Sequence, residues 1–171
     1  DSSGNVYAAG YTTGALDGSN SGSNDIFVVK YNSSGTKQWT KQLGTSSDDI
    51  ANGVAVDSSG NVYAAGYTSG ALDGNTCRGR NDLFVVKYNS SGTKQWTKQL
   101  GPSSGDDANG VAVDSSGNVY AAGYTTGALD GNTSAGSYDL FVVKYNSSGT
   151  RQWTKQLGTS SEDYEIGRAH V

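Results

Sequence analysis

The sequence predicts an all-β fold assembled from repeated units of four antiparallel strands, and two observations carry this prediction. The phrase DSSGNVYAAGYT begins at Asp1 and returns unchanged at Asp57 and Asp114, which sets a repeat of 56 and then 57 residues. Each repeat holds four short runs rich in Val, Tyr, Phe, Trp and Thr, separated by turns of Gly, Ser, Asn and Asp. A tandem repeat of this kind is typical of radially repeated β architectures.

The second repeat shows the four expected strands in order. They cover residues 53–57, 61–68, 83–88 and 94–100. Their β-branched and aromatic residues suit a pleated, half-buried surface. Tight hairpins at 57–60 and 89–92, each with an Asx side chain and a Gly, join the first two and the last two strands. The longer connections, 69–82 and 101–109, therefore lie together on the other side of the sheet.

Polarity along the unit indicates how the sheets are arranged. The first strand is made of small residues that suit a crowded central channel, and the last strand carries two Lys and two Gln. In a β-propeller the outermost strand is an exposed edge, which Lys94 and Lys98 protect here. The last strand also supplies a Trp and a Leu that we expect to pack between neighbouring sheets: Trp39 and Leu43, Trp96 and Leu100, and Trp153 and Leu157.

A family resemblance rests on these same segments. GVAVDSSGNVYAAGYT followed by DLFVVKYNSSGTKQWTKQLG resembles the SBBP family of bacterial β-propeller repeats, and its first half is similar to the NHL repeat. The resemblance covers residues 1–164. It implies four-stranded blades, often in secreted or surface-attached bacterial proteins, with no activity common to the family. We therefore expect an extracellular or cell-surface location, and no catalytic or cofactor-binding residue carries over.

The pattern divides the chain into three blade repeats and a tail. These are 1–56, which starts at the second strand of its blade, 57–113, 114–164, and the divergent residues 165–171. The tail reads EIGRAHV and looks like a translated sequencing adapter, with a divergent terminal strand as the alternative. Arg168 and His170 are therefore not taken as site residues.

Three blades do not close a ring, because propellers typically have ~4–8. We expect completion by further blades of a longer parent chain, by oligomerisation of copies, or by open head-to-tail growth into a filament.

Composition excludes several classes of partner. The 171 residues include 11 Tyr, 3 Phe and 3 Trp, and the formal net charge is −4, whereas disorder usually combines few aromatics with high net charge. No concentrated basic surface is available for nucleic acid. No apolar run approaches the ~18 residues of a membrane span. The sequence therefore predicts neither nucleic-acid binding nor membrane insertion.

Acidic residues gather in the long connections and suggest a cation site. Hard cations such as Ca²⁺ take oxygen ligands from carboxylates and carbonyls. The candidate ligands are Asp73 and Asp82 in the second repeat, and Asp130 and Asp139 in the third. The competing interpretation is that LDG is a turn and that Asp82 caps a strand through bonds to backbone amides. No complete calcium-loop motif is present, which weakens the case for a Ca²⁺ site. No cofactor other than Ca²⁺ is suggested by the sequence.

Catalysis is not predicted. The carboxylate pairs Asp48/Asp49, Asp106/Asp107 and Glu162/Asp163 resemble glycosidase pairs. Acid and base need different environments, however, and repeated units offer equivalent ones. Cys77, flanked by Arg78 and Arg80, is either a thiol of lowered pKa, half of an intermolecular disulfide, or a substitute for a Ser, as at Ser134.

The predicted function is that of a non-enzymatic extracellular β-propeller segment with an architectural role, and its expected partner is itself, in an oligomer or a filament. The alternative is a ligand-binding propeller for glycan, cell wall or protein, with the acidic loops as the binding surface and Ca²⁺ as an aid. Differences between the repeats lie mainly in the two long connections, where specificity would reside.

Overall fold

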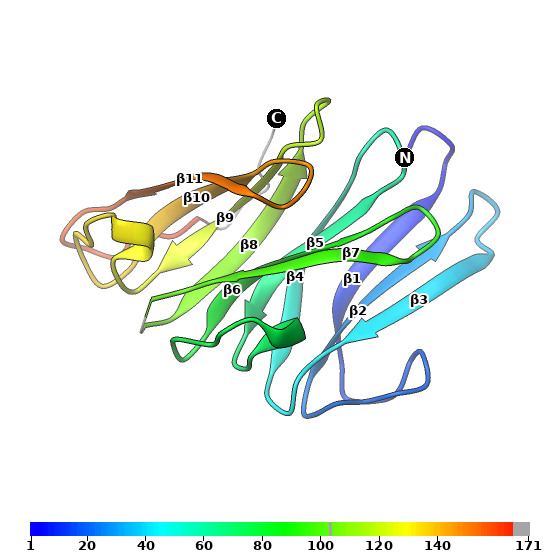
Figure 1. The fold of residues 1–171 in the computed structure, drawn as a ribbon, viewed down its shortest axis with the longest axis horizontal. Coiled ribbons are helices and arrows are strands. Elements are labelled where there is room, and N and C mark those ends of the chain that lie inside the picture. The colour runs from blue at the N-terminus through cyan, green and yellow to red at the C-terminus, as the bar shows by residue number, and fades with distance from the viewer. Residues whose placement is uncertain (103, 166–171) are drawn as a thin grey trace.

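The computed structural model describes residues 1–102 and 104–165, which form three antiparallel sheets lying side by side (Figure 1). The first sheet contains β1 (Val6–Thr12), β2 (Asp25–Tyr31) and β3 (Lys37–Leu43). The second contains β4 (Asp49–Val56), β5 (Val62–Thr68), β6 (Asp82–Tyr88) and β7 (Lys94–Leu100). The third contains β8 (Asp106–Val113), β9 (Val119–Thr125), β10 (Asp139–Tyr145) and β11 (Arg151–Leu157).

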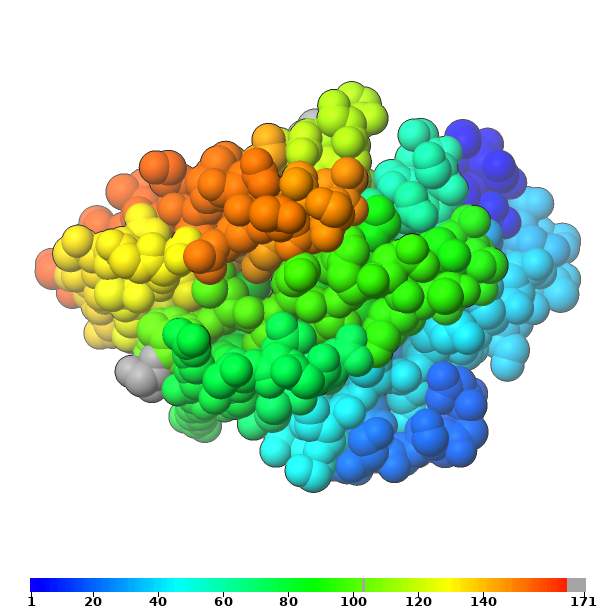
Figure 2. Space-filling view, viewed as in Figure 1, coloured from blue at the N-terminus to red at the C-terminus, as the bar shows by residue number. Residues whose placement is uncertain are grey.

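Each sheet is an up-and-down meander whose strands pair in sequence order, which confirms the predicted all-β propeller fold. β1 is equivalent to β5 and β9, and the position of β4 and β8 has no counterpart in the first sheet within the described ranges. In the space-filling view the second unit, in green, lies between the first and the third (Figure 2). The described sheets form an open row and not a closed ring. The residues 166–171 of the divergent tail lie outside the described part.

The inner strands are longer than the sequence predicts. β4 begins at Asp49 and not at Gly53, because a bulge between Ala51 and Gly53 lets the chain pair with β5 on both sides. β8 has the same bulge. Asp49 and Asp106 therefore begin strands and are fully buried, whereas the sequence had placed them in the long connection.

Small residues are required where the inner strands meet. The side-chain amide of Asn52 donates to the carbonyl of Ala108 at 3.0 Å, so β4 and β8 lie next to each other. A Cβ on Gly53 would lie 3.2 Å from the backbone nitrogen of Val111. Only strands as small as GVAV pack this closely, as the sequence indicates.

The core consists of two layers, each between adjacent sheets. Side chains alternate along a strand, so each sheet has a leading face toward the preceding sheet and a trailing face toward the following one. The leading face of the second sheet packs on the first sheet with Val62, Ala64, Leu72, Phe84, Val86 and Tyr88. Its trailing face packs on the third sheet with Tyr63, Ala65, Leu83, Val85, Trp96 and Leu100. Each junction between sheets thus joins one trailing face to one leading face.

The predicted tight turns form as expected. Gly60 and Gly92 have φ of +77° and +80°, a region that favours glycine. Oδ1 of Asp57 accepts from the amides of Ser59 and Asn61, both at 2.9 Å, and its other oxygen accepts from the Tyr63 hydroxyl. Burial opposes ionisation of Asp57, but these hydrogen bonds outweigh it and lower its pKa.

Candidate functional site

Asp82 holds the long connection of its sheet onto the outer strand. The carboxylate is fully buried at the start of β6. It accepts hydrogen bonds from the amides of Arg78 and Gly79, each at 3.0 Å, and from the side-chain amide of Gln99 at 3.0 Å. The Gln99 carbonyl in turn accepts from the amide of Leu72. Asp82 is therefore saturated with donors from its own sheet.

Asp139 makes the same contacts in the third sheet. It accepts from the amides of Ala135 and Gly136 at 2.8 and 3.2 Å and from Gln156 at 2.7 Å. Burial raises its pKa, but the amide and Gln156 bonds outweigh burial and lower it overall. The sequence analysis missed the role of these Gln residues. The available signal was a Gln 17 residues after the Asp in every repeat, as in Asp25 and Gln42.

Asp73 and Asp130 lie in a different setting. They are the middle residues of the 3₁₀ turns η1 (Leu72–Gly74) and η2 (Leu129–Gly131), both with φ of +54°. Asp73 forms an ion pair with Lys94, and Asp130 forms one with Arg151 at 2.6 Å. The partly exposed pairs connect the turn to the outer strand, and such pairs are worth about 0–1 kcal/mol.

Two of the four proposed Ca²⁺ ligands, Asp82 and Asp139, thus accept hydrogen bonds from backbone amides and a Gln. The other two, Asp73 and Asp130, form ion pairs. Across residues 1–102 and 104–165, no group of three or more His, Cys, Asp or Glu side chains lies close enough to hold a metal ion. Calcium binding by these residues stays a prediction.

The carboxylate pairs are not equivalent, and this corrects the assumed alignment of the repeats. The β-ladder aligns Asp49 with Thr68 and Asp106 with Thr125, so Asp106 corresponds to Asp49, and Asp107 corresponds to Ile50. The two connections have the same length, and the pair lies one position later because Gly105 takes the place of Asp48 and Asp107 takes that of Ile50. The surroundings of Asp49 and Asp106 also differ.

One substitution removes two hydrogen-bond donors from the second of these buried carboxylates. The amide and hydroxyl of Thr45 both donate to Asp49, and Thr159 donates to Asp163 in the same way. The equivalent residue before Asp106 is Pro102, which has no amide hydrogen and no hydroxyl. Asp106 is therefore left without these two donors.

Asp106 consequently has an unusual pKa. Neither of its side-chain oxygens has a hydrogen-bond partner among the described residues within standard distance. Burial raises the pKa of Asp106 to about 7; the nearby Thr125 hydroxyl opposes the shift, and the charges of Asp82 and Asp107 add to it. The group is enclosed in the protein, so it affects stability and not a bound ligand.

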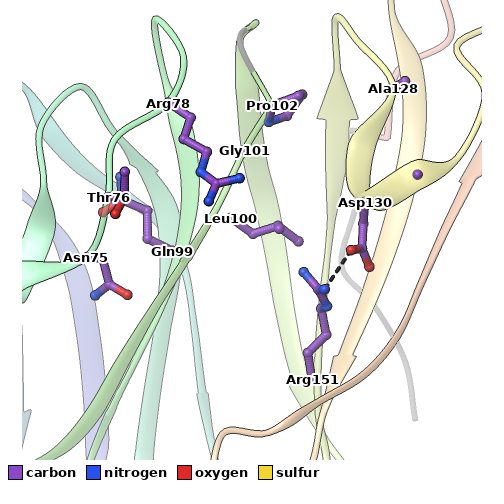
Figure 3. A pocket seen from close by; sticks show the side chains of 11 residues that line it. Asn75, Thr76, Arg78, Gln99, Leu100, Gly101, Pro102, Ala128, Asp130 and Arg151 are labelled. Carbon is purple, nitrogen blue, oxygen red and sulfur yellow. Dashed lines mark ion pairs between the residues drawn. The ribbon is translucent and has the colours of Figure 1, made fainter.

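A groove lies between the second and third sheets on the side of the long connections. Its volume is about 550 Å³. Arg78 projects into it from the second sheet's connection, and Arg151 faces it from β11 beside Asp130 (Figure 3). The floor includes Leu100 and Pro102. Arg78 occupies the place of Ser21 and Ala135 in the other sheets, so the groove's charge comes from a position that varies between repeats.

Cys77 lies within the same connection, one residue before Arg78. It is a free, half-buried cysteine whose Sγ contacts the carbonyl of Gly79 at 3.5 Å. Burial raises its pKa, and the Asp82 charge adds to the increase. The hypothesis of a lowered pKa is therefore wrong. Ser134 makes the matching bond, to Gly136 at 3.2 Å.

At each junction between sheets, a Trp ring packs against Tyr rings of both sheets and donates a hydrogen bond to a backbone carbonyl of the next sheet. The indole of Trp39 lies between the rings of Tyr7 and Tyr88, with centroids 6.5 and 6.3 Å away, and donates to the carbonyl of Ser90 at 3.2 Å. Trp96 lies between Tyr63 and Tyr145 and donates to Ser147 at 3.3 Å. The prediction that these Trp residues pack between sheets is confirmed.

The third copy differs. Trp153 and Leu157, also predicted to pack between sheets, are 37% and 68% exposed. The prediction fails for them because no described sheet follows β11.

The two helical segments within residues 1–102 and 104–165 are three-residue turns, and neither is long and apolar enough to span a bilayer.

Comparison with known proteins finds a known repeat in two parts of the chain. The model of the SBBP β-propeller repeat matches residues 38–72 and 95–129. Each matched stretch begins in the outer strand of one sheet and ends in the 3₁₀ turn of the next.

Two relatives are much longer than this chain. The chain is 28% identical over 94% of its length to Regulatory protein FlaEY of Caulobacter vibrioides, of which it spans 19%. It is 28% identical over 81% of its length to an uncharacterized WD repeat-containing protein of Acanthamoeba polyphaga mimivirus, of which it spans 12%. The SBBP β-propeller repeat model thus matches two of the repeats in this chain, and the meandering sheets agree with the blades that such repeats form.

Proposed function

We propose that this chain is a non-enzymatic architectural module of an extracellular or cell-surface protein, and that its sheets also associate between copies. The observation that carries the proposal is the position of the exposed apolar side chains. Large hydrophobic residues of the described ranges that remain exposed lie on the first sheet, on the last sheet, or just after it: Val6, Tyr11, Leu16, Trp153, Leu157 and Tyr164.

The internal junctions show what these side chains do when they are covered. Val6 and Leu16 are 60% and 51% exposed, whereas their equivalents Val62 and Leu72 are fully buried against the preceding sheet. Full burial of such a side chain contributes about 1.5–3 kcal/mol. A further sheet of the same kind, placed at either end, would recover this free energy.

The enclosed carboxylates and the relatives' names support a role without catalysis. Asp82 and Asp139 are used in structural contacts, and the relatives carry the names of a regulatory protein and a WD repeat-containing protein. The extracellular location rests on the SBBP resemblance.

Mass measurement and electron microscopy test the proposal. Light scattering of the purified chain over a wide concentration range should show multiples of the 17.7 kDa chain mass, and micrographs should show rings or filaments. A constant monomer mass at every concentration would overturn the self-association.

A ligand-binding role is the second candidate, and the groove beside Arg78 and Arg151 favours it. Guanidinium groups suit carboxylate-bearing glycans or protein segments. Calorimetry with neutral and acidic glycans, with and without Ca²⁺, should give heat with acidic glycans that the Arg78→Ser substitution removes. Equal heats for both proteins would place binding elsewhere, and no heat would remove this candidate.

A further inference from the structure

We infer that a second copy of this chain docks head to tail, with Trp153 of one copy seated on the turn at residues 32–35 of the other. The inference rests on the proposed self-association and specifies its contact, its direction and its partner. It extends to a third junction the contact that the chain makes twice within itself.

The internal junctions define two halves of the contact. The donor half is a Trp on the outer strand, with a Tyr ring and a Lys of the same sheet. At the first junction Trp39 and Lys30 both reach the carbonyl of Ser90, at 3.2 and 3.3 Å. At the second, Trp96 and Lys87 both reach the carbonyl of Ser147, at 3.3 and 3.1 Å. The indole N–H of a Trp and the ammonium group of a Lys thus donate to the same backbone carbonyl in the turn of the next sheet.

The acceptor half is a turn with room for the indole ring. A Cβ on Gly92 would lie 3.0 Å from the Trp39 ring, and one on Gly149 would lie 2.9 Å from the Trp96 ring. Both glycines are buried by the contact. The preceding Tyr88 and Tyr145 stack beside the indole and are each 3% exposed. The turn therefore supplies a carbonyl, a flat glycine surface and a Tyr ring.

A complete donor half remains free on the third sheet. Trp153 lies 6.2 Å from the Tyr120 ring, the same separation as between Trp96 and Tyr63. Lys144 lies over the Tyr120 ring at 5.2 Å, as Lys87 does over Tyr63 at 5.3 Å. Because these side chains already have the arrangement seen in a completed junction, docking would order little that is now mobile.

A complete acceptor half remains free on the first sheet. Gly35 has φ of +78°, close to the +80° of Gly92, but a Cβ there would meet no atom within 4 Å. The side-chain oxygen of Asn32 accepts from the amides of Ser34 and Thr36, as Asn89 does at the internal junction. The turn is therefore already shaped to receive an indole, and its Ser33 carbonyl corresponds to that of Ser90.

The placement of the halves sets the direction of assembly. The donor half is on the trailing face of the last sheet, and the acceptor half is on the leading face of the first. A contact between unlike surfaces is heterologous, so copies add in one direction and give rings if the rotation closes or filaments if it does not. A two-fold dimer would pair like with like and would leave both halves unused.

Two substitutions and their mixture test this contact. Trp153→Ala removes the donor half. Tyr31 is the first sheet's equivalent of Tyr88, so Tyr31→Ala removes the stacking ring of the acceptor half. Each variant alone should remain largely monomeric, with association at least about tenfold weaker than that of the wild type. The equimolar mixture should form a one-to-one heterodimer and nothing larger, because it offers a single intact combination: Trp153 of one variant with Tyr31 of the other.

Gln152→Ala is the matched control. Gln152 is exposed on the same strand, and its equivalents Gln38 and Gln95 are exposed at the internal junctions, so its removal should leave association unchanged. Circular dichroism and urea unfolding of each variant report whether the sheets remain intact.

The outcomes separate this inference from the proposed function. If the wild type assembles and both variants assemble equally well, this contact is wrong and self-association stands. If the mixture forms oligomers larger than two, the single-junction geometry is wrong. If the wild type is monomeric throughout, self-association fails and the docking contact fails with it.

Discussion

At the scale of single residues, the buried carboxylate of Asp82, at the start of β6, should be far more important for stability than the partly exposed carboxylate of Asp73 in η1. Asp82→Asn places an amide against the donors of Arg78, Gly79 and Gln99 in a buried site, so we expect a loss of about 2 kcal/mol. Asp73→Asn removes only a partly exposed ion pair and should cost under about 1 kcal/mol. Urea unfolding of the two isosteric variants measures the difference. Equal losses would mean that Asp82 does not hold the connection.

Asp106 should give the protein an unusual pH dependence. A carboxyl whose folded pKa is raised contributes stability that is fully present below its unfolded pKa of about 3.9 and is lost as pH rises from there through the folded value, here about 7. Asp106→Asn mimics the protonated form. It should unfold at about the same urea concentration as the wild type near pH 3, and its advantage should grow between about pH 4 and pH 7 to about 4 kcal/mol at pH 8.

Restoring the missing donors should reduce this pH dependence, although burial still raises the pKa of Asp49, which has them. Pro102→Thr recreates the arrangement in which Thr45 donates twice to Asp49, so the pKa of Asp106 should fall and the wild-type loss at pH 8 should shrink. If the stability of Pro102→Thr falls with pH as much as that of the wild type, the proline is not the cause of the raised pKa of Asp106. Other carboxylates contribute equally to all three proteins and cancel in the comparison.

Pro102 also shows what the sequence could not reveal at this scale. The residue is visible in the sequence, but its effect depends on aligning it with Thr45 and Thr159 and on knowing that each Thr reaches the Asp four residues later. The assumption that repeated carboxylates have equivalent surroundings fails for that reason. The sequence did indicate the turn interpretation of the LDG motif, whereas the Gln99 contact needed the sheet register.

At the scale of strands, the bulge in the inner strand makes one glycine essential. A Cβ on Gly66 would lie 2.9 Å from the Cα of Ala51 and would also overlap the Ile50 carbonyl, and neither backbone group can move freely. Gly66→Ala should therefore cost about 3 kcal/mol or more.

The first sheet provides the matched control for Gly66. Gly10 is the equivalent residue, but no inner strand of residues 1–102 and 104–165 lies beside it, and a Cβ would meet the end of the Phe27 ring. Gly10→Ala should cost under about 1 kcal/mol. Thermal unfolding of both variants measures this difference. Equal decreases in melting temperature would contradict the bulge as the reason why residue 66 must be glycine.

The strands themselves are well predicted by sequence, and their ends are less so. The outer strand at 94–100 is correct to the residue, and the second and third strands are correct to within one. The inner strand was predicted too short because Asp49 and Asn52 have low strand propensity. Their burial and pairing in a bulge are tertiary effects that local composition does not contain.

At the scale of the whole molecule, calcium addition should change the melting temperature by less than about 1 °C. Ligands stabilise in proportion to their occupancy of the folded state. The candidate oxygens of Asp82 and Asp139 already accept from amides, and Asp73 and Asp130 face cationic side chains. Calorimetric scans in calcium and in chelator test this, and a clear rise in calcium would show that the loops rearrange around an ion.

The repeat predicted the stacking of sheets correctly but could not show which surfaces are left uncovered. Trp39, Trp96 and Trp153 lie in nearly identical segments, and sequence alone assigns them the same packing. Only the arrangement of whole sheets distinguishes the two that are covered from the one that is not.

The boundaries of the matched repeat affect how a gene with several blades can gain or lose one. Each matched stretch crosses from one sheet into the next, so a duplicated unit carries a trailing face together with the leading face that fits it. Recombination between the near-identical coding segments at Asp57 and Asp114 would add or delete one whole blade and recreate the same junction at the join. The number of blades can therefore vary between related genes without any new complementary surface having to arise.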